Sequence, residues 1–155
     1  MNVAPDWGQL ALDIRLASRT SSPVLISAPS DCAENVARAI AAFSCVRHGP
    51  GVVVCDCAQG GSVTRAVEEA RAAVGSADVT LVLREVHALG AAGQREAACL
   101  IAALPPDAAA APRIIATSSV SLFDCVRDGA FDERLFYRLN VVHIVINGRE
   151  DAPRD

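Results

Sequence analysis

The residues from Leu25 to Ile40, LISAPSDCAENVARAI, read as an apolar strand that runs through a tight loop into a helix. In α/β proteins such a junction can hold a phosphate, because loop glycines let backbone N–H groups close around it while a lysine adds positive charge. Here the loop has no glycine, Pro29 removes one N–H donor, and Asp31 and Glu34 add negative charge. All 14 basic residues of the chain are arginines. The segment therefore predicts the architecture of a phosphate site without its chemistry.

Other residues able to do chemistry follow two further apolar runs. Arg84 and Glu85 come directly after residues 79–83, and Cys55 and Cys57 lie near the end of another run. Because strand side chains alternate, both thiols face one side, but there is no CxxC and no second Cys/His cluster at zinc spacing. The histidines fall at scattered positions, namely His48, His87 and His143. We expect structural thiols, no metal site and no Cys/His nucleophilic site.

Composition narrows the class of protein. The net charge of −4 and pI near 5.3 disfavour broad nucleic-acid binding, and no basic cluster is present. No apolar run approaches the roughly 20 residues needed to span a bilayer, and the N-terminus lacks the pattern of a secretion signal. We therefore expect a cytoplasmic protein with reduced cysteines, no direct DNA contact and no membrane association.

The periodicity of apolar residues predicts alternating helices and strands. Helices are expected over 7–17, 33–43, 63–74, 94–104 and 120–128, with a short helical turn after that, and strands over 24–26, 52–55, 79–83, 113–116 and 140–146. This alternation predicts a three-layer α/β domain with a mainly parallel five-stranded sheet. We assign residues 1–148 to one domain and 149–155 to a flexible tail.

Several segments, in order, resemble the AAA+ ATPase domain of the sigma-54-dependent bacterial enhancer-binding proteins. RIIATSSVSLFDCVRDGAFDERLFYRLNVVHI, residues 113–144, is similar to that family's sensor-1 strand, the following helix and the arginine-finger segment. PVLIS and ENVARAI resemble the strand and helix that flank the Walker A loop. VVVCDCA resembles the second strand, VTLVLREVHALG takes the Walker B position and QREAACLIAAL the helix after it. The resemblance implies a P-loop NTPase core, here without the family's helical lid.

The departures from this pattern affect the nucleotide chemistry. The family's glycine-rich, lysine-containing loop is replaced by a vestigial one: Ala28, Pro29, Ser30, Asp31, Cys32, Ala33 and Glu34. At Walker B, Arg84 stands where the family has the aspartate that binds Mg²⁺, and an arginine cannot bind a cation. Glu85 keeps the carboxylate, which we expect to pair with Arg84 or another surface arginine, and Ser119 replaces the sensor asparagine. The resemblance thus implies no catalytic residue, no nucleotide site and no cofactor.

The resemblance to the enhancer-binding proteins also indicates which binding partners to expect. The GAFTGA loop that contacts sigma-54 in the family is absent between residues 58 and 79, so direct contact with sigma-54 is not expected. The family's first interface arginine aligns with Asp132, whereas Arg138 is retained and Arg134 lies one helical turn before it. These two arginines contact a partner or, alternatively, Arg138 binds an acidic group of its own domain.

Two readings of function follow. One is a catalytically inactive protein-interaction module, a transcription-related regulator that acts through self-association or an intact activator. The alternative is a residual ATP-binding protein or ATPase that uses arginines in place of lysine. A fragment of a larger activator is a third option, although truncation would not explain the internal loss of the GAFTGA loop.

Overall fold

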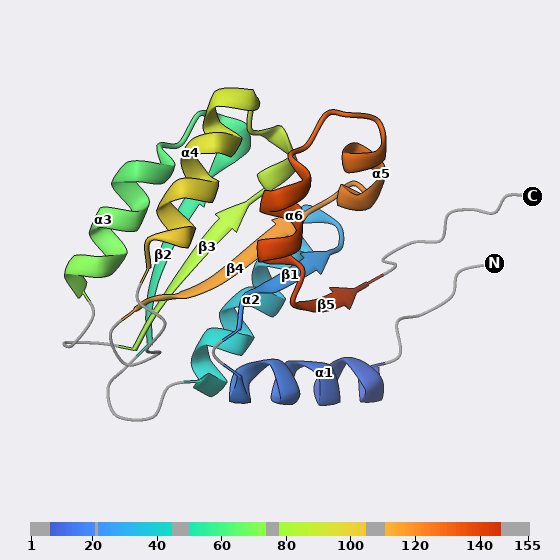
Figure 1. Ribbon diagram of the computed structural model, residues 1–155. Coiled ribbons are helices and arrows are strands. Elements are labelled where there is room, and N and C mark those ends of the chain that lie inside the picture. Colours follow the sequence, from blue (N-terminus) through green and yellow to red (C-terminus); the bar gives the residue numbers. More distant parts are fainter. Residues whose placement is uncertain (1–6, 21, 45–49, 74–77, 105–110, 147–155) are drawn as a thin grey trace, which may run out of the picture.

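The computed structural model describes residues 7–20, 22–44, 50–73, 78–104 and 111–146 (Figure 1). The helices in this part of the chain are α1 (Trp7–Arg19), α2 (Ser30–Ser44), α3 (Val63–Ala73), α4 (Ala91–Ala102), α5 (Leu122–Arg127) and α6 (Glu133–Leu139). The strands are β1 (Val24–Ser27), β2 (Pro50–Asp56), β3 (Asp78–Arg84), β4 (Arg113–Ser118) and β5 (Val142–Val145). Short 3₁₀ turns follow β2 and β3 at Cys57–Gln59 and Val86–Ala88. The predicted tail, residues 149–155, and His48 lie outside the described residues.

All five strands run parallel in one sheet of order β2-β3-β4-β1-β5. The first strand therefore lies inside the sheet, between β4 and β5, with Leu25 opposite Ala116 on one side and His143 on the other. Parallel strands place their carboxyl ends at one edge, which gathers the residues that follow β1, β2, β3 and β4. The predicted five-stranded α/β architecture is confirmed.

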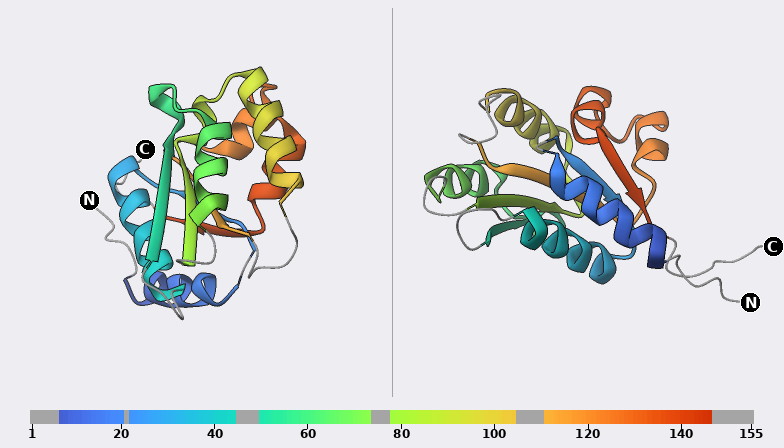
Figure 2. Two further views of the ribbon diagram at one scale, coloured as in Figure 1. Left: turned by 90° about the vertical axis from the view of Figure 1, so that its left-hand side faces the viewer. Right: turned by 90° about the horizontal axis from the view of Figure 1, so that it is seen from below.

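Helices cover both faces of the sheet. Figure 2 shows α1 and α2 on one side, with α3, α4, α5 and α6 on the other. Alternate residues of β1 divide between the two layers, since Val24 and Ile26 pack with α2 while Leu25 packs with α3, α4 and α6. The core on both faces is built mainly from Ala, Val, Leu and Ile, as a chain with few aromatic residues requires.

The element boundaries differ from the sequence predictions at one place that concerns the site. Helix α2 begins at Ser30 rather than near Ala33, so only Ala28 and Pro29 connect it to β1. The sequence pattern could not locate this start, because Ser, Asp and Cys are compatible with both a loop and a first helical turn. Within the described residues, no helix combines the length and the apolarity that crossing a bilayer requires.

Candidate functional site

The junction between β1 and α2 is closed by backbone hydrogen bonds. The Ala28 N–H donates to the Ser118 carbonyl at 3.1 Å, which extends the pairing of β1 with β4. The Pro29 carbonyl accepts from the Ala33 N–H at 2.8 Å in the first turn of α2. Ser30 to Glu34, predicted as part of a vestigial loop, are helical. A phosphate loop needs several free N–H groups arranged around an anion, and a two-residue connection has no room for that arrangement.

The side chain of Arg84, at the end of β3, lies between the ends of β2 and α2. Its Nη1 donates to Asp56 Oδ2 at 2.6 Å, and its Nη2 donates to Ser30 Oγ at 3.1 Å. Its Nε lies 3.4 Å from Glu34 Oε1. The hydrogen bond that Arg84 donates to the Asp56 carboxylate is the main cause that raises the pKa of Arg84. The guanidinium of Arg84 is thus surrounded by the carboxylates of Asp56 and Glu34 and the hydroxyl of Ser30, at the carboxyl ends of the strands.

Glu34 also binds a second arginine. Its Oε2 accepts from Arg38 Nη2 at 3.0 Å and from Arg38 Nε at 3.2 Å, one turn further along α2. The negative charge that Glu34 adds to this segment is therefore paired with two arginines within the molecule. Asp56 in turn caps the following 3₁₀ turn, since its Oδ1 accepts from the Ala58 N–H at 3.1 Å.

Glu85 forms no ion pair with an arginine among the described residues. Its two carboxylate oxygens accept from the N–H and the Oγ of Ser119, each at 2.8 Å, and Oε1 lies 3.7 Å from His87 Nδ1. Its own N–H donates to Thr117 Oγ1 at 3.1 Å, and its backbone is left-handed, with φ of 54°. The expectation that Glu85 pairs with an arginine was wrong. The left-handed backbone re-aims its side chain toward β4, a turn that residue types alone do not reveal.

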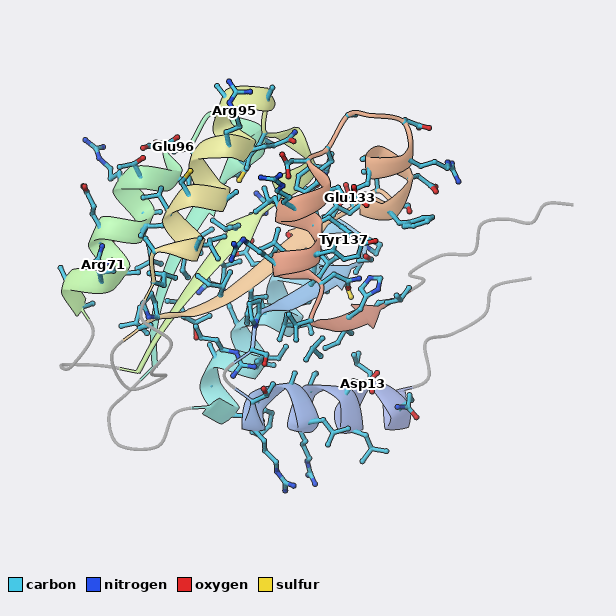
Figure 3. The ribbon with its side chains drawn as sticks, in the orientation of Figure 1. Asp13, Arg71, Arg95, Glu96, Glu133 and Tyr137 are labelled. Carbon is cyan, nitrogen blue, oxygen red and sulfur yellow. The ribbon has the colours of Figure 1, made fainter. Side chains whose placement is uncertain are left out.

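Helix α6 exposes the two arginines singled out in the sequence. Arg134 and Arg138 are both exposed, and neither forms an ion pair within the described segments. Glu133 and Tyr137 lie on the same helix, and Figure 3 shows both side chains leaving α6 on one side. The acidic group of the same domain that Arg138 was expected to bind as an alternative is not found in this part of the chain.

Two polar residues fix the start of α6. Asp132 is its N-cap and accepts from the Leu135 N–H through Oδ1 at 3.0 Å. Gln94 of α4, which is 5% exposed, accepts from the Asp132 N–H at 2.7 Å. It donates to the carbonyls of Leu89 at 2.8 Å and Ala130 at 3.0 Å. The sequence did not single out Gln94, although a glutamine on the buried face of a predicted helix indicates a side chain that forms hydrogen bonds in the core.

The remaining candidates do not converge. Cys55 and Cys57 are buried, and burial raises the pKa of Cys57 to about 12, so it is a thiol at neutral pH. His87 Nδ1 lies 3.1 Å from Ser118 Oγ beside Glu85, whereas His143 Nε2 lies 2.8 Å from Ser27 Oγ on the other side of β4. Among the described residues there is no cluster of three or more metal-ligating side chains.

The parallel sheet with an interior first strand, and a helix that starts at the end of that strand, define a P-loop NTPase-like domain. The family model described as the sigma-54 interaction domain matches residues 4–148. The chain belongs to this family, the ATPase-like domain of sigma-54 activators. A search of curated proteins finds no match.

Solved structures support the same fold. NtrX from Brucella abortus in complex with ATP is 25% identical with a TM-score of 0.70, over 90% of this chain and 36% of NtrX. NtrX from the same organism in complex with ADP is 24% identical with a TM-score of 0.71, over 90% of this chain and 35% of NtrX. The P-loop NTPase domain of a sigma-54 transport activator from E. coli is 18% identical with a TM-score of 0.66, over 92% of this chain and 96% of that domain. The chain thus spans about a third of the NtrX chains it matches.

Proposed function

We propose that this chain is a member of the sigma-54 activator family that neither binds nor hydrolyses ATP and acts through protein contacts. It regulates a transcription-related process by associating with itself or with an intact activator. One observation carries the proposal: Arg84 stands at the Walker B position and is bound by Asp56, Ser30 and Glu34. A cation of the protein itself lies at the strand ends, where the family's aspartate would hold Mg²⁺.

The junction before α2 supports the loss of nucleotide binding. Each charge-assisted hydrogen bond to a phosphate contributes roughly 1.5–3 kcal/mol, and losing two weakens binding on the order of 100-fold or more. This chain has no lysine, and its Ala28 amide is already bonded to Ser118. Glu85 is oriented by Ser119 and His87 instead of by a metal and an attacking water.

Titration calorimetry with Mg²⁺–ATP tests this part of the proposal. We expect no saturable heat up to about 1 mM nucleotide, which corresponds to binding weaker than about 4 kcal/mol. NtrX from Brucella abortus, which has been crystallised with ATP, is the positive control under the same conditions. Micromolar binding by this chain would instead favour the residual ATP-binding alternative.

The surface of α6 supports the interaction role. Arg134 and Arg138 are exposed, as is Tyr137 (62%) on the same helix, and further large apolar side chains are exposed at Val141 (56%), just after α6, and at Phe123 (58%) on α5. Exposed aromatic residues beside arginines are the composition typical of interface centres. The GAFTGA sequence is absent between residues 58 and 79, and α3 (Val63–Ala73) takes up much of this stretch, which favours a partner other than sigma-54.

The interaction role is tested by capture from a native lysate and by sedimentation of the pure protein. We expect Arg138→Glu to weaken self-association or partner capture at least tenfold, because it reverses an exposed charge on α6. Arg71→Glu on α3 is the matched control, since Arg71 is an exposed arginine on a different helix (Figure 3). Equal behaviour of the two variants would exclude α6 as the interface.

A further inference from the structure

Strand β2 forms one edge of the sheet. The sheet order places it outermost, and among the described strands it pairs only with β3 (Figure 2, left). The Asp56 carbonyl accepts the Gly61 N–H at 3.0 Å, and within the described residues β2 makes no other backbone–backbone hydrogen bond outside the sheet. Alternate residues of an edge strand direct their N–H and C=O groups outward. The outer side of β2 is therefore a row of groups with which a further strand can pair.

The two edges of the sheet differ in how they are protected. Proteins usually protect an edge by making the strand short or by placing charged residues or proline on it. The other edge strand, β5, has four residues, whereas β2 has seven. Residues 51–55 of β2, GVVVC, carry no charge, and Pro50 is only the first residue of the strand. The β5 edge is thus short, whereas the β2 edge is long, apolar and able to pair.

The side chains of β2 divide between the two faces of the sheet. Val53 and Cys55 pack in the core on the α3 side, and Val52 packs in the core on the α2 side. Because strand side chains alternate, Val54 shares the face of Val52, yet it is 37% exposed. A large apolar side chain is therefore left uncovered in the strand that forms the edge.

We propose that β2 pairs in antiparallel orientation with β2 of a second copy of this chain, so that two five-stranded sheets join into one. Only one antiparallel register pairs all seven residues, and it places Val53 on the twofold axis. In that register Val54 lies opposite Val52 of the second copy on the same face, and the two side chains cover each other. The pairing adds about six hydrogen bonds between the chains, since alternate residues of each strand point toward the other.

The charges of the strand favour a second copy as the occupant. Asp56 is the one charged residue of β2, and in this register it lies opposite Pro50 of the second copy. Its carboxylate is already paired with Arg84 of its own chain. The joined sheets also bring α3 of both copies to the same face. The charged residues of α3 carry no net charge, being Arg65, Glu68, Glu69 and Arg71. The contact therefore brings no like charges of the two strands together.

The pairing of two identical strands also limits the size of the assembly. An antiparallel β2–β2 contact uses the same surface on both copies and closes at a dimer. Pairing of β2 with β5 of another copy would use two different surfaces and would continue into a fibre. The length of β2 and the shortness of β5 favour the closed contact.

This contact goes beyond the proposed function, because it uses a different surface. Helix α6 leads into β5 at the opposite edge of the sheet from β2. A dimer formed through β2 therefore leaves Arg138 of both copies exposed for another protein. The α6 variant Arg138→Glu does not weaken this dimer, and the titration with ATP does not report on it.

Sedimentation equilibrium of the pure protein tests the contact. We expect a monomer of 16.1 kDa in exchange with a dimer of twice that mass, with a Kd of about 1–100 µM. Val54→Lys weakens the dimer at least tenfold, because it places a charge opposite Val52 of the second copy, as natural edge strands do to prevent pairing. Val54→Thr is the matched control, since it keeps a β-branched, uncharged side chain, and its Kd stays within about threefold of the wild type.

Hydrogen exchange of the wild-type protein locates the contact without depending on a variant. Amides of residues 51–55 that point outward exchange faster on dilution from about 1 mM to about 1 µM, whereas those of β5 do not change. Thermal denaturation at the lower concentration checks that Val54→Lys is folded.

The outcomes separate this contact from the α6 surface. The proposal is overturned if the protein stays monomeric up to about 1 mM, if assembly continues past the dimer, or if Val54→Lys dimerises as tightly as Val54→Thr. It is also overturned if Arg138→Glu abolishes the dimer, which would make α6 the surface of self-association and leave the proposed function in place. A dimer that only Val54→Lys weakens, with partner capture unchanged by Arg138→Glu, supports this contact and removes the role proposed for α6.

Discussion

Replacing Gln94 by Leu gives the sharpest test of how α6 is positioned. The substitution keeps an apolar body of similar size but removes three hydrogen bonds, to the Leu89 and Ala130 carbonyls and from the Asp132 N–H. At a net 0.5–1.5 kcal/mol each, their loss lowers the free energy of unfolding by about 3 kcal/mol. For a chain of this length that corresponds to a fall in Tm of roughly 6–12 °C.

Thermal and urea denaturation measure the change, and hydrogen exchange locates it. Because Gln94 holds the residue that caps α6, the amides of residues 133–139 exchange faster in the Gln94→Leu variant while those of β3 change less. Arg95→Leu is the control on the same helix, since Arg95 is exposed, and we expect a change within about 0.5 kcal/mol (Figure 3). A Gln94→Leu variant as stable as the wild type would refute the reasoning.

Three further predictions concern the strand ends and the sheet edge. Arg84→Asp lowers the urea midpoint more than Arg84→Asn of the same size, because it adds a third carboxylate beside those of Asp56 and Glu34. Raising the salt concentration makes the difference between the two urea midpoints smaller, because salt screens the repulsion. Equal midpoints of the two variants would contradict this prediction. Partial burial of His143, whose side chain stays partly exposed, lowers its pKa in the folded state below the ordinary value of 6.5, so the unfolded chain binds more protons and stability falls as pH decreases through that value. His143→Gln removes this contribution, and denaturation curves from about pH 7.5 to 5.5 should show a shallower decline than in the wild type. Gly61→Ala puts a Cβ 2.9 Å from the Asp56 carbonyl oxygen and lowers stability by about 1–3 kcal/mol, whereas Gly90→Ala, whose Cβ meets nothing within 4 Å, costs less than about 1 kcal/mol in the same assay.

The sequence predicted the features that depend on local pattern. Compact apolar runs located β1 and β3, and helical spacing located α3, because burial on both faces and amphipathicity leave a direct trace in residue order. The family followed from the ordered series of segments, and the match over residues 4–148 confirms it.

The contacts within the site depend on residues far apart in the chain, and the sequence did not reveal them. Arg84 meets Asp56 across 28 positions and Ser30 across 54, and no periodicity records such a meeting. Glu85 was assigned the wrong partner because charge was the only guide, whereas its left-handed backbone directs it to Ser119.

The short junction before α2 and Arg84 at the end of β3 both affect the carboxylates of Glu34 and Asp56. With residues 30–34 drawn into the helix, Glu34 approaches the strand ends, where Asp56 already lies. Two carboxylates at such a site repel each other unless a cation lies between them. In an ATPase of this fold a metal and a lysine can fill that role, whereas here Arg84 does so and also joins α2 to the sheet. The two features are coupled: an aspartate at position 84 would remove the cation, and a longer loop before α2 would still leave the guanidinium in place.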